Sequence, residues 1–381
     1  MKKKFNLESI FVFLFLTLFP LGQVIRIGVI HPIDIVAGLG ALYALITKQK
    51  KPDIFKHLEN FLLFVIISWI FGIFIFKTNL VLYGLLYLLR LVSYIYFLIY
   101  VWNFAREEKN KNLLLNSLLS VSFVSAIFGW IQMFTVPDLK PFFDLGWDMH
   151  LFRLVGTFLD PTFLGLIIVF GLILSIHRFI DSKSWKYVLI SVFLLISLAF
   201  TYSRASYLAL FAVLAVIGYQ KKIFKQLLLV ATTFIVLTFL LPTSKNHSIE
   251  LLRSFSAIAR LDNYKSTLTI FTKSPVFGIG YNNMCIAYNK YIGPQNFSSH
   301  ACSGSDSSIL FILATTGVVG FIVFIYSLFK IKNNLKHSTY YTLLTTSFIA
   351  LIVHSVFSNS VFYPWILGWV IILLAMAITT R

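Results

Sequence analysis

Long apolar runs separated by short polar connections make up most of this chain of 381 residues. Twelve runs approach the roughly 20 mostly apolar residues that a membrane-crossing helix needs. They lie near 9–25, 28–47, 59–77, 79–102, 113–134, 159–179, 186–202, 205–220, 224–241, 308–329, 339–358 and 362–379. A segment in lipid must satisfy its own backbone hydrogen bonds, and these runs are too long and too uniformly apolar for barrel strands. The pattern therefore predicts an all-α polytopic membrane protein with about 12 transmembrane helices.

The basic residues of the connections predict how these helices are oriented. If the N-terminus is cytoplasmic and every run crosses, twenty lysines and arginines fall in the cytoplasmic segments. The short outside loops then hold only Arg26, Lys77, Lys140, Arg153 and Arg204. Such a bias is typical of cytoplasmic loops, so we expect a multi-pass protein with both termini in the cytoplasm. The initial Met-Lys-Lys-Lys and its apolar run lack a small-residue cleavage site, so we expect this run to remain as the first helix.

Composition supports a membrane protein and excludes one class of partner. Hydrophobic residues make up 58% of the chain, charged residues 12%, and the mean hydropathy is +0.85. Soluble domains are roughly 45–50% apolar and 25% charged. The net charge of +18 is spread over many short connections, whereas nucleic-acid binding needs charge clustered on one face. We therefore expect no nucleic-acid partner and a single integral membrane domain over residues 1–381.

The one long hydrophilic segment, residues 243–306, lies between the ninth and tenth predicted helices and is expected to be an extracytoplasmic loop. It holds a Gly-Ile-Gly turn at 278–280 and both cysteines, Cys285 and Cys302. An extracytoplasmic compartment permits disulfides, so these two cysteines are either bonded or two separate thiols. The loop's basic residues are Lys245, Arg253, Arg260, Lys265, Lys273 and Lys290. Because the rest of the chain is so apolar, this loop is the first place to look for chemistry on the water side.

Two arginines lie where lipid disfavours charge. Arg204 stands between two spans with almost no loop, beside the polar residues Thr201, Ser203 and Ser206. An arginine at that depth needs an anionic partner or a watery cavity, and its planar fork of donors suits phosphate oxygens. The alternative is an arginine that extends from a helix end toward water. Arg90, deeper in its span, either faces the bundle interior and pairs with an acid or a ligand, or it forms a structural ion pair or extends toward the surface.

Asp160 and Pro161 begin the sixth predicted span. Proline suits the first turn of a helix and a preceding aspartate caps its free amides, so this pair is expected to start the helix. Arg153, seven residues earlier and on the outside, has no such local explanation.

The long loop offers further candidates. Residues 249–272 are expected to form an amphipathic helix on which Arg253 and Arg260, about two turns apart, share a face. Such a pair either clamps a diphosphate or forms an ordinary solvated face. Asp306 is either a general base or the N-cap of the next helix, and His300 is either a base or an exposed loop histidine.

Four motifs follow one another between residues 153 and 320. The first two are Gly156-Thr-Phe-Leu-Asp-Pro-Thr-Phe-Leu-Gly165 and Thr201-Tyr-Ser-Arg204. The third is Arg260 with Pro275-Val-Phe-Gly-Ile-Gly280, and the fourth is Asp306-Ser-Ser-Ile-Leu with Gly317-Val-Val-Gly320. In this order, and on a twelve-span topology, they resemble the integral membrane O-antigen ligase and O-antigen polymerase family.

The family patterns are, in the same order, Gly-Thr-Phe-x-Asp/Asn-Pro-Asn, Thr-x-Ser-Arg, Arg…Pro-x-x-Gly-x-Gly and His/Asp-Asn/Ser-x-Tyr-Leu…Gly-x-x-Gly. This chain departs from them at Thr162, where asparagine is usual, and at Asp306-Ser307, where the family's ligases commonly have His-Asn. His300, six residues upstream, does not occupy that position. The second departure favours a polymerase over a ligase.

The resemblance implies a metal-independent glycosyltransferase that uses no cofactor. Such enzymes transfer a glycan from undecaprenyl diphosphate to an acceptor hydroxyl at the outer face of the bacterial inner membrane. The acceptor is another lipid-linked repeat unit in a polymerase and the lipid A core in a ligase, and a chain-length regulator is a further candidate partner. Arginines would neutralise the leaving diphosphate, and an acid or a histidine at the end of the loop would deprotonate the acceptor.

On that basis the expected catalytic residues are Asp306, Arg204, Arg260 and His300. The expected diphosphate-binding residues are Arg204, Arg260, Arg153, Arg253 and Arg90. A flippase or another transporter of lipid-linked glycans is the alternative from a different class. Transporters often show repeated halves and broken helices in matching positions, and the sequence contains neither.

Overall fold

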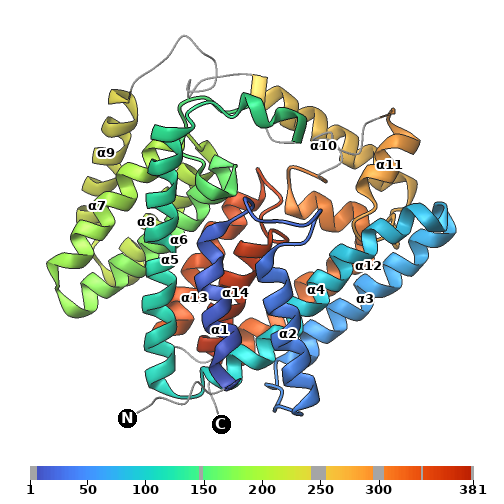
Figure 1. Ribbon diagram of the computed structural model, residues 1–381, viewed down its shortest axis with the longest axis horizontal. Coiled ribbons are helices and arrows are strands. Elements are labelled where there is room, and N and C mark those ends of the chain that lie inside the picture. Colours follow the sequence, from blue (N-terminus) through green and yellow to red (C-terminus); the bar gives the residue numbers. More distant parts are fainter. Residues whose placement is uncertain (1–6, 146–148, 242–254, 295–303, 336–337, 379–381) are drawn as a thin grey trace.

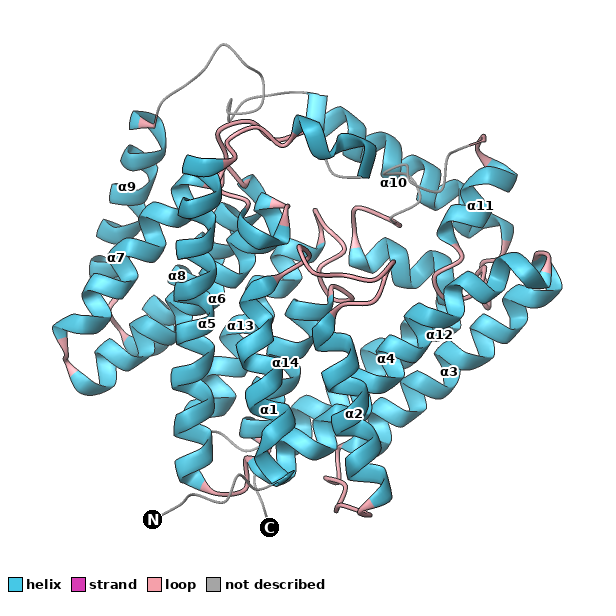
Figure 2. Cartoon of the chain, viewed as in Figure 1, coloured by secondary structure: helices cyan, strands magenta, loops and turns pink. Residues whose placement is uncertain are grey.

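The computed structural model describes residues 7–145, 149–241, 255–294, 304–335 and 338–378. These residues form fourteen α-helices with short 3-10 turns and no β-strand (Figure 2). Twelve helices match the predicted spans one to one: α1 (Leu7–Leu18), α2 (Pro32–Ile46), α3 (Phe55–Ile75), α4 (Thr78–Phe104), α5 (Glu108–Thr135), α6 (Pro161–Ser182), α7 (Trp185–Phe200), α8 (Arg204–Lys221), α9 (Phe224–Leu240), α12 (Ser308–Asn334), α13 (Thr339–Ser355) and α14 (Pro364–Ala377). The other two, α10 (Phe255–Lys273) and α11 (Met284–Tyr291), lie inside the predicted loop. The all-α prediction is confirmed for this part of the chain.

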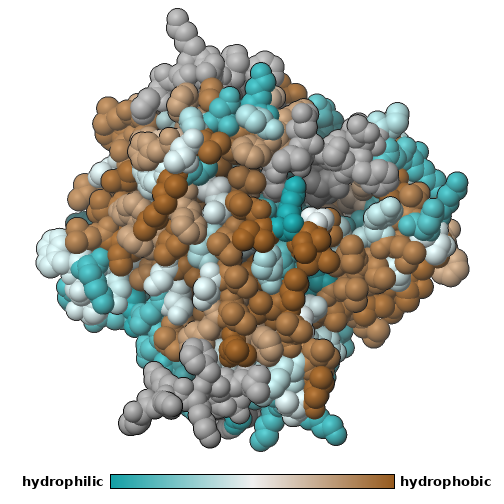
Figure 3. Space-filling view, in the orientation of Figure 1, coloured by the Kyte–Doolittle hydropathy of each residue, from teal (hydrophilic) through white to brown (hydrophobic). Residues whose placement is uncertain are grey.

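The lengths and surfaces of the helices are those of a multi-pass membrane protein. Five helices, α3, α4, α5, α6 and α12, are long and apolar enough to cross a membrane, and α1, α2, α7, α9 and α14 are apolar but shorter. Large apolar side chains point outward, among them Ile46 (70% exposed), Phe74 (81%) and Leu240 (76%). Figure 3 shows hydrophobic residues over much of the flank of the bundle. Extended apolar surface of this kind marks a face that contacts lipid or protein. That all twelve helices cross the membrane stays a prediction.

The helices form one bundle with α6 at its centre. Every residue of α6 from Leu164 to Ser175 is buried, as expected for a helix that is hydrophobic on all sides. Helices α5, α7, α8 and α13 pack against it. In Figure 1, α10 and α11 lie across the end of the bundle opposite the two chain ends. The predicted loop therefore covers the end away from both termini.

Helix α12 is broken in the middle by a segment of that loop. Gly317 has φ 67° and ψ −175°, which interrupts the helical hydrogen bonds. The loop supplies replacements: Ile279 N donates to the Ala314 carbonyl (3.0 Å) and Val318 N donates to the Pro275 carbonyl (2.8 Å). A helix can break at membrane depth only where other protein groups satisfy the freed backbone in this way.

The Gly278–Gly280 turn fits against this break. Both glycines have positive φ, 75° and 92°, which agrees with the turn expected from the sequence. A Cβ on Gly278 would lie 2.3 Å from the Thr315 carbonyl oxygen. Ile279 is fully buried. Part of the predicted water-side loop is therefore packed inside the bundle, and α10 and α11 on either side of it are held close to the other helices.

Candidate functional site

Asp160 starts α6 as the sequence predicts. Its Oδ1 accepts a hydrogen bond from Thr162 N at 2.6 Å, and Pro161 occupies the first helical position. The side chain therefore satisfies one of the free amides of the first turn. This cap places the beginning of α6 next to the beginning of α8, since Ser206 Oγ donates to the Thr162 carbonyl at 3.2 Å.

Arg204 is the first residue of α8. Ser203 caps this helix by accepting a hydrogen bond from Ser206 N. The preceding residue, Tyr202, has φ 49°, so the chain makes a tight turn between α7 and α8. The turn lets Arg204 follow directly after the previous span, as the sequence indicated.

Arg153 holds that turn. Its side chain is almost completely buried, and its Nε and Nη2 donate to the Thr201 carbonyl at 2.9 and 2.8 Å. Nη2 also donates to the Tyr202 carbonyl at 3.1 Å. Two donors on one carbonyl use the planar geometry of the guanidinium. Arg153 thus positions the backbone that leads to Arg204. This contact explains an arginine at position 153, for which the sequence offered no local reason.

Asp306 lies at the start of α12 but does not cap it. The capping side chain is Ser307, which accepts a hydrogen bond from Leu310 N. The N-cap alternative for Asp306 is therefore wrong, because capping needs one side chain and Ser307 provides it. The Asp306 N–H donates to Asn263 Oδ1 of α10 at 2.8 Å, so α10 is held against the start of α12.

Helix α10 brings Arg260 into the same region. The positive charges of Arg204 and Arg260 act on each other. Burial raises the pKa of Tyr264, one turn after Arg260; the Arg260 charge lowers that pKa and the Asp306 carboxylate raises it. The charges of Arg204 and Arg260 therefore act on each other, and Asp306 is tied to α10 through Asn263, so α8, α10 and the start of α12 each bring one charged side chain to this end of the bundle. We call these three residues the charged triad.

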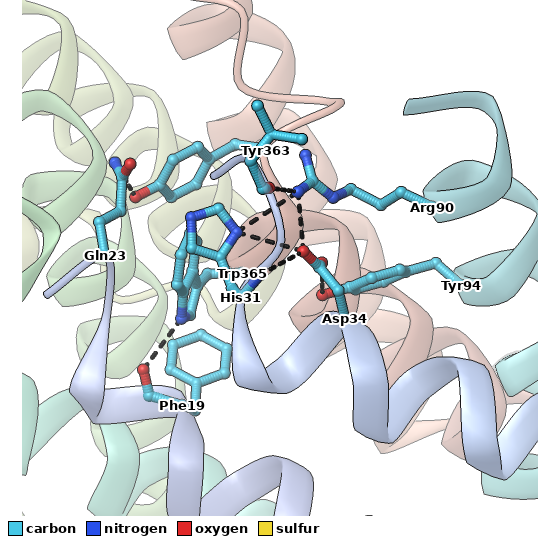
Figure 4. Close-up of polar contacts among 9 residues, drawn as sticks. Phe19, Gln23, His31, Asp34, Arg90, Tyr94, Tyr363 and Trp365 are labelled. Atoms are coloured by element: carbon cyan, nitrogen blue, oxygen red, sulfur yellow. Dashed lines mark hydrogen bonds and ion pairs between the residues drawn. The ribbon is translucent and has the colours of Figure 1, made fainter. Parts of the chain in front are cut away.

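Arg90 belongs to a different group, shown in Figure 4. Its Nη2 forms an ion pair with Asp34 Oδ2 at 2.7 Å and also donates to the Val29 carbonyl. Asp34 further accepts hydrogen bonds from His31 N (2.9 Å) and from Tyr94 OH (3.1 Å). Of the two expectations for Arg90, pairing with an acid is the one that the structure bears out. The ion pair ties α2 to α4.

Two buried polar residues were not predicted from the sequence: the acid of this pair and one histidine. Asp34 lies within the second apolar run and His354 within the eleventh, and both are largely buried. The available signal was simple: a charged or titratable side chain in a predicted span faces a partner or a cavity. His354 bridges three segments near the charged triad, as described below.

Three of the expected residues, Arg253, His300 and Cys302, lie outside the described residues. Of the two alternatives for the cysteines, Cys285, in the first turn of α11, is disulfide-bonded; a pairing with Cys302 falls outside the described residues. Within the described ranges, no three His, Cys, Asp or Glu side chains gather closely enough to hold a metal ion. Metal independence stays a prediction.

Comparison with known proteins supports the resemblance seen in the motifs. Residues 189–325 match the family model described as O-antigen ligase. This region runs from α7 into α12 and includes the whole charged triad and the break in α12. A search of curated proteins found no match. The chain is therefore a multi-pass membrane protein that carries an O-antigen ligase family domain over residues 189–325.

Proposed function

We propose that this protein is a glycosyltransferase that polymerises a lipid-linked surface glycan such as O-antigen at the outer face of the bacterial inner membrane. The observation that supports this most directly is the charged triad. Two arginines and one carboxylate, from three segments far apart in the sequence, share one neighbourhood at the end of the bundle that α10 covers.

Arg204 and Arg260 are suited to bind a diphosphate. Two cations whose charges repel each other gain most from a ligand that carries more than one negative charge, and arginine can bind phosphate oxygens with two parallel hydrogen bonds. Helix N-termini lie beside these charged side chains as well. The starts of α6 and α8 are hydrogen-bonded through Ser206, and α12 begins beside the carboxylate. Helix N-termini favour anions because their free amides and dipoles point toward them.

The reaction follows from these placements. The oxygen of the acceptor hydroxyl attacks the anomeric carbon of the donor glycan while the bond from that carbon to the phosphate oxygen breaks. The hydroxyl proton passes to the Asp306 carboxylate, and undecaprenyl diphosphate leaves with the bonding electron pair. Arg204 and Arg260 stabilise the negative charge that develops on the diphosphate, and such stabilisation commonly accounts for much of an enzyme's rate enhancement.

The length of the surface glycan in cells that carry variants of the protein tests the mechanism. Arg204→Ala or Arg260→Ala is expected to leave short glycans, because loss of one such donor typically slows the chemical step by about 100- to 1000-fold. Lys265→Ala is the matched control, since Lys265 lies on the same helix α10 with its side chain 78% exposed. Normal long chains in either arginine variant would refute the mechanism. The variants must also be present in the membrane at the level of the control.

A ligase is the second candidate, because the matching family model is described as O-antigen ligase. Deletion separates the two functions. Loss of a polymerase leaves single repeat units attached to the lipid A core, whereas loss of a ligase leaves long chains on the lipid carrier. Elongation of lipid-linked glycan by the purified protein in detergent would eliminate a flippase, because transport is impossible there.

A further inference from the structure

His354 lies at the junction of three segments close to the charged triad. It is the last residue but one of α13 and is completely buried. Its Nε2 lies 3.1 Å from the Thr162 carbonyl oxygen at the start of α6 and 3.3 Å from Ser206 Oγ at the start of α8. Its Nδ1 lies 2.6 Å from Ser360 Oγ, in the connection between α13 and α14. One imidazole therefore joins two helix starts to that connection.

The partners determine which nitrogen carries the proton. A backbone carbonyl can only accept, so Nε2 must donate its hydrogen to the Thr162 oxygen. Nδ1 of a neutral ring is then an acceptor, and the Ser360 hydroxyl donates to it. In this state both ring nitrogens have a partner, as buried polar atoms require. The ring is thus used to connect segments rather than to exchange protons with water.

The connection between α13 and α14, which contains Ser360, also forms hydrogen bonds with the start of α12. Ser308 Oγ donates to the Ser358 carbonyl (3.4 Å), and Val361 N donates to Ser308 Oγ (3.1 Å). Ser308 is the first residue of α12, two positions after Asp306. A continuous set of hydrogen bonds therefore links the start of α8, which carries Arg204, through His354 to the start of α12.

Resting on the proposed function above, we infer that His354 is a positioning residue for the transfer reaction. It sets the start of α8, with Arg204, relative to the start of α12, with Asp306. It does so through a neutral ring that donates from Nε2 and accepts at Nδ1. A displacement of about 1 Å between reacting groups can slow catalysis by about 100-fold. His354 is therefore expected to affect the rate of transfer more than the binding of the donor.

Two substitutions separate the two nitrogens. In His354→Gln the amide nitrogen can occupy the Nε2 position and still donate to the Thr162 carbonyl. In His354→Asn the amide reaches only the Ser360 side and loses Thr162 and Ser206. We expect His354→Asn to lower kcat by about 10- to 100-fold with the KM for the lipid-linked donor changed less than about threefold. His354→Gln keeps the Thr162 side but loses Ser360, so it also breaks the link to the start of α12, and we expect it to lower kcat by a similar factor.

The control is His177→Asn on α6. His177 is also a buried histidine, but it lies near the opposite end of that helix, with only 3% of its surface exposed. It should lose a similar amount of thermal stability in detergent with kcat unchanged. A wild-type kcat in His354→Asn or in His354→Gln, or an equal loss of kcat in His177→Asn, would overturn the inference.

A separate measurement distinguishes a failure of the positioning inference from a failure of the proposed function. If the wild-type protein transfers no glycan, the proposed function fails first, and positioning is then judged from the binding of inorganic diphosphate. Weaker binding in both His354 variants than in His177→Asn would support the positioning role in that case. Binding equal to that of His177→Asn would overturn it.

Discussion

The arginines of this protein differ in what surrounds them. Arg153 donates to backbone carbonyls and Arg90 pairs with Asp34, so each has contacts that explain why it is buried. Arg204 and Arg260 lie within reach of each other's charge. Two like charges at one site disfavour each other's charged form, and an anion between them relieves this repulsion. The sequence could indicate that each arginine was unusual, but not what each one contacts, because the contacts come from distant segments.

The same pair of arginines predicts how one substitution changes ligand binding. Arg260→Gln removes one of the two positive charges that would hold a diphosphate. Inorganic diphosphate should raise the unfolding temperature of the wild type and raise that of the variant much less, because ligand stabilisation follows affinity. Lys265→Gln, an exposed change on the same helix, should alter neither value. An equal increase in the wild type and in Arg260→Gln would contradict a role for Arg260 in diphosphate binding.

At the scale of elements, hydropathy located all twelve apolar helices, and their ends agree with the structure to within a few residues for most of them. The expected helix at 249–272 corresponds to α10, which begins at Phe255 within the described residues. The break in α12 was not predicted. A lone glycine in an apolar run gives no sign of a break, because the conformation of Gly317 depends on backbone groups of residues 275–280, which are distant in sequence.

Gly317→Ala is expected to destabilise the protein through this break. The added Cβ would lie 2.2 Å from the Val276 carbonyl oxygen, at a residue with φ 67°. With ψ near −175° as well, this backbone conformation is essentially confined to glycine and costs another residue roughly 1–3 kcal/mol, and the clash adds to that cost. Gly293→Ala is the control, since a Cβ there meets no atom within 4 Å. Thermal unfolding in detergent measures both variants, and an unchanged unfolding temperature for Gly317→Ala would contradict this account.

At the scale of the whole molecule, the candidate site is assembled from parts that the sequence keeps far apart. The motifs suggested that Arg204, Arg260 and Asp306 act together. In the fold the charges of Arg204 and Arg260 act on each other, and Asp306 is hydrogen-bonded to Asn263 on the helix that carries Arg260. That the three act together stays a prediction. His354 could not be found in the same way, because no motif contains it and its role depends on how α6, α8 and α13 pack. The hydropathy of a single helix says little about which other helices it packs against.

The predicted orientation can be tested with single cysteines. In a chain that carries Cys285→Ser and Cys302→Ser, Lys265→Cys on α10 should react with a membrane-impermeant thiol reagent added outside the inner membrane. Lys225→Cys, at the exposed start of α9, should react only after the membrane is opened. The two ends of the bundle then lie on opposite sides, as the positive-inside rule requires. The reverse labelling pattern would overturn the assigned orientation.

The break in α12 has a consequence for how the protein is made. Residues 308–329 contain no charge and no proline, so during insertion this segment can enter the bilayer as a straight helix. The break forms only when residues 275–280 arrive to accept and donate its backbone hydrogen bonds. A change that keeps this segment away, such as a side chain on Gly278, would therefore let α12 straighten rather than unfold. The start of α12, with Asp306, would then change its position relative to α10, so the docking of one short segment is expected to decide whether an inserted chain becomes active.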